Sequence, residues 1–165
     1  MPATAPKSYS MVQKVLHWPV AVIILEQLFL GETMSGAWRA FVRNADSSGF
    51  SDPVVLFHIW GGLSVAAFAA WRLLLRRTTG VPAEPANEPA WMKLSASLAH
   101  IALYALMFLV PISGAAAYFG GISIAAEVHE FMKPVLIIVL IGHVLGALYQ
   151  HFIAKTDVLK RMTHG

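Results

Sequence analysis

Residues 130–153 read EFMKPVLIIVLIGHVLGALYQHFI, and this apolar run decides the fold class. An α-helix rises about 1.5 Å per residue, so about 20 residues cross the hydrocarbon core of a bilayer, which is about 30 Å thick. The run is long enough for that crossing and carries few charges. It therefore predicts a transmembrane helix that contains His143, with His129 immediately before its start.

Three further apolar runs of similar length lie upstream, at residues 15–33, 54–75 and 98–119. The chain of 165 residues is 57% hydrophobic and 13% charged, and its mean hydropathy is +0.62. These values are too apolar for a soluble domain of this size. Short segments rich in turn-forming residues separate the runs. We therefore expect an all-α fold, an integral membrane four-helix bundle that forms one domain over residues 1–165.

The first run could be mistaken for a cleaved signal peptide, because Lys7 and Lys14 precede it. His17 and Glu26 interrupt its apolar stretch, however, and no small-residue cleavage motif follows it. We therefore expect the 15–33 helix to stay in the mature protein.

The distribution of lysine and arginine predicts the orientation of the bundle. Nine of the twelve lie in the N-terminal tail, at or between the second and third runs, or in the C-terminal tail. Cationic loops stay on the cytoplasmic side of a membrane, so both termini should be cytoplasmic. These cations lie at the ends of apolar runs and form no single basic patch, so we expect lipid and no nucleic acid as the surrounding partner.

The polar groups within the runs are mostly histidines, and the chain has no cysteine. Without cysteine, c-type haem attachment, iron–sulfur clusters and disulfides are excluded. Histidine is costly in hydrocarbon and faces a bundle interior with a partner. Six of the seven histidines lie in or beside the expected helices, and they are His17, His58, His100, His129, His143 and His151. Their number favours ligation of a cofactor over isolated interfacial histidines.

Depth sorts these histidines into two levels. With cytoplasmic termini, His58 and His129 both lie near the outer surface. His143 follows His129 by 14 residues, which places it about 21 Å deeper and about 40° from the same helix face. His17 lies at a similar inner depth. Two imidazoles on one iron give a six-coordinate centre suited to electron transfer, so two such centres would connect the two membrane surfaces.

Spacing alone leaves the inner level unresolved. His151 is rotated from His129 by about 40° in the other direction, so helical geometry does not choose between His143 and His151. His100 lies at the inner level as well. The cations Lys14, Arg72 and Arg76 are candidates for contacts to haem propionates there, although anchoring at the membrane surface explains them equally.

Several stretches resemble the bacterial cytochromes b561, which are four-helix di-haem membrane proteins. They are Leu16-His17-Trp18, His58-Ile59-Trp60-Gly61-Gly62, Trp71-Arg72-Leu73-Leu74-Leu75-Arg76, Ala99-His100, Leu109-Val110-Pro111-Ile112-Ser113-Gly114, His129-Glu130, Gly142-His143 and Leu159-Lys160-Arg161-Met162. The resemblance extends over nearly the whole chain. It implies a multi-pass protein of the bacterial inner membrane.

The resemblance also implies ligands and an activity. It pairs His17 with His143 at an inner haem b, and His58 with His129 at an outer haem b. His100 and His151 then become candidates for propionate or quinone contacts. The implied activity is oxidation of a periplasmic donor, with superoxide suggested, and delivery of the electrons to ubiquinone.

Two other functions use the same pattern of helices and histidines. A haem b subunit could anchor a separate dehydrogenase or hydrogenase in the membrane, which would require a partner redox subunit. A histidine-lined metal transporter is a non-redox alternative, but the histidines are spread over about 20 Å of depth and few carboxylates accompany them. Glu26, on the far side of its helix from His17, is expected to be protonated, to have a partner or to mark a proton path.

Overall fold

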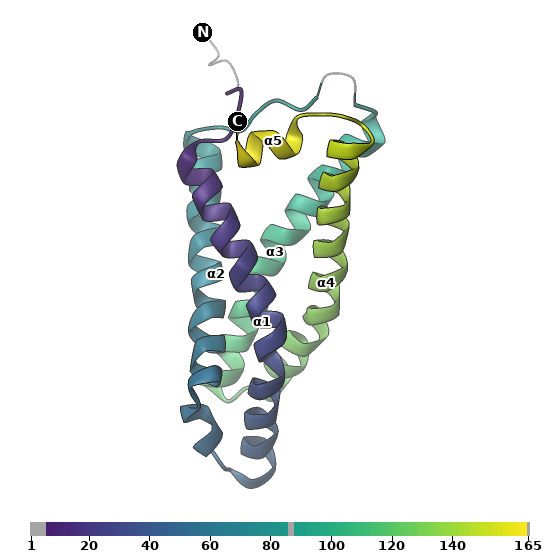
Figure 1. Cartoon of the computed structure of the whole chain (residues 1–165). Coiled ribbons are helices and arrows are strands. Elements are labelled where there is room, and N and C mark those ends of the chain that lie inside the picture. The colour runs from purple at the N-terminus through teal and green to yellow at the C-terminus, as the bar shows by residue number, and fades with distance from the viewer. Residues whose placement is uncertain (1–5, 86–87, 165) are drawn as a thin grey trace.

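The computed structural model describes residues 6–85 and 88–164, and these residues form helices and loops without a strand. Their order is α1 (Met11–Asn44), the 3-10 helix η1 (Ser48–Ser51), α2 (Pro53–Thr78), α3 (Ala90–Gly120), α4 (Ser123–Phe152) and α5 (Val158–Thr163). Four of them, α1 to α4, are long and apolar enough to cross a membrane. They run up and down as a bundle, and the start of α1 lies at the same end as α5 (Figure 1). The expected all-α membrane bundle is confirmed.

Local chemistry explains where the helices begin and end. Ser10 caps α1 through a reciprocal pair of hydrogen bonds with Gln13. The Asp52 side chain accepts a hydrogen bond of 2.7 Å from Val54 N, and Pro53 fills the first position of α2, where its missing N–H costs nothing. Gly121, at φ 63°, ends α3 in the left-handed conformation that glycine adopts without strain.

The helices extend beyond the predicted spans, because apolarity reports only the part of a helix that lies in hydrocarbon. The first helix was expected at 15–33 but continues to Asn44, so it is about 51 Å long. Rings from α1, η1 and α3 contact one another at its outer end, through Phe41 to Phe50 and Phe50 to Tyr118. The fourth helix begins at Ser123 and not at 130, so His129 lies within α4.

The core of the bundle is small, as expected for a protein whose outer surface faces lipid. Most large apolar side chains are exposed, and each of the four long helices contributes only a few buried ones to a shared cluster. The cluster consists of Val20, Ile24, Val65, Ala69, Leu106, Met107 and Leu136. Consecutive helices pack against each other, whereas α1 and α4 make few contacts along their described lengths. The space between α1 and α4 is where the inner histidines lie.

Candidate functional site

Two pairs of histidine rings face each other across the bundle, one near each end. His17 of α1 and His143 of α4 have ring centres 6.4 Å apart. His58 of α2 and His129 of α4 have ring centres 6.0 Å apart. A metal–imidazole bond is about 2.0 Å and the ring centre lies about 1.1 Å behind that nitrogen, so two imidazoles on opposite sides of one metal have ring centres about 6.2 Å apart. Both pairs have the spacing of opposed axial ligands.

His129 is fixed in orientation by the middle of α3. Its Nδ1 lies 2.8 Å from the backbone oxygen of Val110. A carbonyl can only accept, so Nδ1 carries the proton and Nε2 keeps the lone pair that a metal requires. The Ser113 hydroxyl donates to the same oxygen at 2.9 Å. A Cβ on Gly114 would approach the His129 ring to 3.0 Å, so glycine is needed there to seat the ring.

A cavity of about 600 Å³ adjoins the outer pair, within the size range of roughly 300 to 1,000 Å³ that binds small ligands. Both His58 and His129 line it, together with apolar side chains from all four long helices. It also reaches Arg39 on the outer extension of α1. Beside it, the Ser35 hydroxyl of α1 donates to Glu130 of α4 at 2.6 Å. An apolar cavity lined by two imidazoles suits haem better than a bare ion.

The inner level contains a third histidine. The His100 ring centre lies 5.3 Å from that of His143, which is too short for two opposed ligands of one metal. His100 also hydrogen-bonds the backbone of Ala96. Within residues 6–85 and 88–164, no group of three or more His, Asp or Glu side chains is arranged to hold a metal ion. Of the His17 and His100 rings, that of His17 thus has the spacing to His143 that a shared metal would require.

The other predicted inner residues lie around this level. Arg72 is close enough to His17, His100 and His143 to act electrostatically on all three. Lys14 is 8% exposed at the start of α1. The His151 ring packs on Phe152, with ring centres 4.7 Å apart.

Glu26 and Gln27 are neighbours with opposite surroundings. Glu26 is exposed and lines a shallow groove with residues such as Phe29 and Phe57. It has no hydrogen-bond or ion-pair partner among the described side chains, so of the three alternatives given above, a partner is not found there. Both amide atoms of Gln27 are buried and lack a partner in the described part of the chain. Gly61 lies directly against Gln27, so its missing side chain makes room for this amide rather than for a cofactor.

Two features of the outer site escaped the sequence analysis. The Val110 carbonyl could not be identified, because which backbone oxygen is accessible depends on how α3 and α4 pack. Lys133 was given no role, yet it lies inside α4 and close enough to His58 to act on it electrostatically. Its position four residues after His129, on the same helix face, was the available signal.

Comparisons with known proteins identify the family of the chain. A family model described as prokaryotic cytochrome b561 matches residues 8–165. The chain is 31% identical to cytochrome b562 of Cereibacter sphaeroides over 159 residues, covering 96% of this chain and 97% of that protein. It is 25% identical to cytochrome b561 homolog 2 of Escherichia coli K12 over 179 residues, covering 95% and 92% of the two chains. The chain therefore belongs to the prokaryotic cytochrome b561 family, and it is a multi-pass bacterial membrane cytochrome of the b type that acts in electron transfer.

Proposed function

We propose that this cytochrome carries electrons between two haems b, from a donor at the outer membrane surface to ubiquinone. Superoxide is the donor that the family resemblance suggests. The proposal is supported above all by the two histidine pairs, whose ring centres lie 6.4 Å and 6.0 Å apart at opposite ends of the bundle. The electrons balance in this reaction. Two superoxide anions release two electrons on oxidation to two molecules of dioxygen, and one quinone takes up two electrons and two protons to become quinol.

A different pair of histidines would bind each of the two haems. His17 and His143 would bind the inner iron, and His58 and His129 the outer one. When bound, haem b supplies an iron that accepts and releases single electrons. The Val110 carbonyl keeps His129 in the tautomer that can bind metal, and packing in the cluster between the two levels keeps bulk water out. Arg72, Lys14, His100 and His151 are the candidates for contacts to propionates or to the quinone at the inner level.

The first experiment is a haem count on the detergent-purified protein. We expect about two haems b per chain by pyridine haemochrome, and we expect His58→Ala and His143→Ala each to remove one low-spin centre from the reduced-minus-oxidised spectrum. His164→Ala is the matched control, because His164 is exposed outside the bundle and should leave both centres intact. Well-folded, haem-supplied protein that binds no haem would contradict the proposal.

The donor and acceptor are tested next on the loaded protein. Superoxide should reduce the haems in the absence of other donors, and a short-chain ubiquinone should reoxidise them. Reduction only in the presence of a co-purifying dehydrogenase or hydrogenase would instead identify the chain as the haem-bearing anchor of that enzyme. The outer end of α1 and η1, which extends well past the apolar part of the bundle, offers such a partner a contact surface (Figure 1).

A further inference from the structure

Three buried side-chain nitrogens at the inner end of the bundle have no hydrogen-bond partner within the described ranges. They are Arg72 Nε on α2, His151 Nδ1 on α4 and Arg161 Nε on α5. A buried donor without an acceptor destabilises the folded protein, and a charged donor does so more strongly than a neutral one. Two buried guanidinium donors at one end of the bundle, together with an imidazole nitrogen that is able to donate, indicate a ligand rich in acceptor oxygens.

Tyr9 lies among the same groups, just before α1. Burial raises the pKa of its hydroxyl, while the nearby Arg76, Arg72 and Arg161 oppose that rise. The hydroxyl of Tyr9 is thus a neutral donor next to three guanidinium groups. The sequence indicates Arg72 and Arg76 as candidates for propionate contacts, whereas it assigns no role to Tyr9 or Arg161.

The C-terminal helix α5 brings Arg161 to this place. After α4 the chain turns, and α5 lies across the inner end of the bundle (Figure 1). Trp18, the neighbour of His17, donates from Nε1 to the Met162 carbonyl at 3.4 Å. Arg161 itself donates from Nη1 to the Ala83 carbonyl at 2.6 Å and pairs through Nη2 with Asp157 at 2.8 Å. These bonds position α5 beside the inner histidine level and leave Arg161 Nε as the donor without an acceptor.

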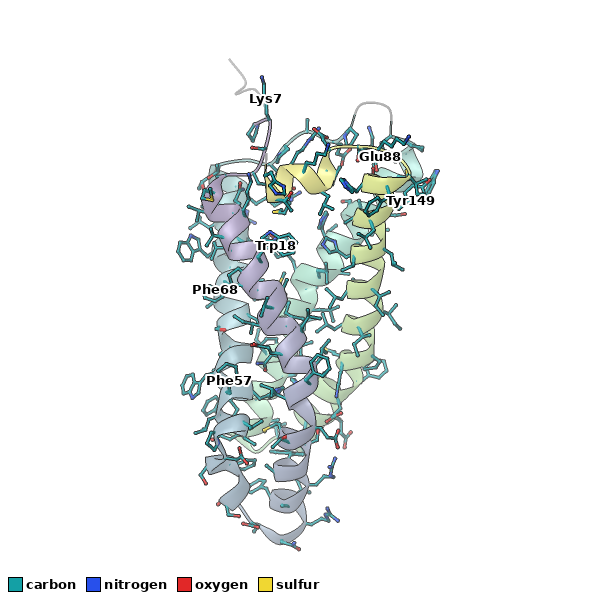
Figure 2. All side chains as sticks on the ribbon, in the orientation of Figure 1. Lys7, Trp18, Phe57, Phe68, Glu88 and Tyr149 are labelled. Carbon is teal, nitrogen blue, oxygen red and sulfur yellow. The ribbon has the colours of Figure 1, made fainter. Side chains whose placement is uncertain are left out.

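The charges at this end do not balance. Among the described residues, ion pairs join Arg39 to Glu32 and Arg161 to Asp157, so neither Arg72 nor Arg76 has a carboxylate within ion-pairing distance. Guanidinium groups bind carboxylates in charge-assisted hydrogen bonds, which are about twice as strong as neutral ones. Figure 2 shows the labelled Trp18 at this end of the bundle, below α5.

We propose that Arg161, Arg72 and Tyr9 bind the propionate groups of the haem held by His17 and His143, so that α5 forms part of the inner cofactor site. This inference rests on the proposed function. A propionate supplies a fixed carboxylate at the level of the histidines, which fits donors that lie next to Trp18 and Arg72. The phosphate of an anionic lipid has similar chemistry but reaches the bundle from its surface, and the experiment separates the two.

The test compares Arg161→Gln with Lys160→Gln, which removes the same charge from the exposed neighbour of Arg161. Both are made in the His58→Ala background, where only the inner haem is expected to remain. A cation near the iron favours the reduced state, so Arg161→Gln should shift the ferrous-to-ferric ratio at fixed potential about tenfold toward ferric, a fall of about 59 mV in midpoint potential. Lys160→Gln should leave the potential within error of its parent.

Further variants make the result independent of folding defects. Arg161→Lys should recover part of the shift, and Tyr9→Phe, which keeps the ring, should lower the potential in the same direction. Equal shifts for Arg161→Gln and Lys160→Gln, or none for either, would overturn the proposal. The proposal would also be overturned if the difference in midpoint potential between Arg161→Gln and its parent disappeared once anionic lipid was removed from both proteins. Lipid phosphate would then be the ligand of Arg161. Failure of the proposed function is distinguishable, because the parent would then lack the inner haem altogether.

Discussion

His129 is the residue whose role is best defined by its surroundings. Its Nδ1 donates to the Val110 carbonyl, which also accepts from the Ser113 hydroxyl. The stretch 109–114, quoted above for its family resemblance, therefore builds a seat for an imidazole on the next helix. His58 has no equivalent support, since its buried Nδ1 has no hydrogen-bond partner in the described part of the chain. The two outer histidines are thus held with different stiffness.

Gly114 is the position at which a single methyl group should disturb the outer site. In Gly114→Ala the new Cβ would lie 3.0 Å from the His129 ring, so the ring must shift away from its present position. We expect weakened binding of one haem, seen as a lower haem content and a broadened signal from one low-spin centre. Gly36→Ala is the control, because a Cβ at Gly36 meets nothing within 4 Å. Equal haem content in the two variants would contradict the claim that Gly114 leaves room for the His129 ring.

Sequence reasoning reached the histidines but not their supports. Depth along a helix depends only on residue spacing, so the levels of His17, His58, His129 and His143 could be predicted from the sequence. Hydrogen bonds to backbone carbonyls depend on side-by-side packing and carry no sequence signal. Spacing alone left His143 and His151 as alternatives, and the family resemblance suggested His143 as the partner of His17. In the structure the ring centres of His17 and His143 lie 6.4 Å apart.

Among the elements, α5 was not expected at all. It has only 6 residues, too few for a periodic apolar pattern, and its lysine and arginine were interpreted as a cationic tail. The four spanning helices were predictable because each is a long apolar run. Their ends were not, because capping groups and aromatic contacts outside the hydrocarbon extend a helix past its apolar stretch.

The attachment of α5 should depend on pH. Hydrogen bonding to Arg161 lowers the pKa of Asp157, so the folded state favours the ionised carboxylate. Its contribution to stability is present above the ordinary aspartate range of about 4 and is lost as pH falls through the lower pKa of the folded state. A spin label on a single cysteine at position 160 should therefore become more mobile below about pH 4.

Asp157→Asn supplies the control for this titration. The variant lacks the carboxylate, so its label should be mobile at neutral pH and should change little on acidification. The chain has no cysteine of its own, so the label is unique. Identical pH profiles in the two proteins would show that another group releases α5.

At the scale of the whole molecule, the bundle keeps α1 and α4 apart while each packs on its sequence neighbour. Composition alone predicted four helices and a membrane location. It could not predict this separation. At the inner level, α1 and α4 face each other through His17 and His143. At the outer level, a cavity of about 600 Å³ lies between the helices. A cavity depends on how the helices pack, so no single residue in the sequence indicates it.

The orientation of the molecule is a prediction from its charges. Nine of the twelve lysine and arginine residues lie at the end that carries α5. We expect a cysteine at position 160 to be protected from an impermeant maleimide in intact cells, and a cysteine at position 47 to react. Lysis should expose both sites. Labelling of position 160 alone in intact cells would reverse the assigned topology.

The spacing of His129 and His143 along α4 has an electrical consequence. Fourteen residues correspond to about 21 Å, roughly two-thirds of the hydrocarbon thickness of about 30 Å. One charge crossing the whole of a 100 mV membrane potential exchanges about 2.3 kcal/mol with it, so an electron passing from the outer to the inner level works against about 1.5 kcal/mol when the cytoplasm is negative. An energised membrane would therefore slow inward flow and favour its reversal, making this cytochrome sensitive to voltage without any moving part.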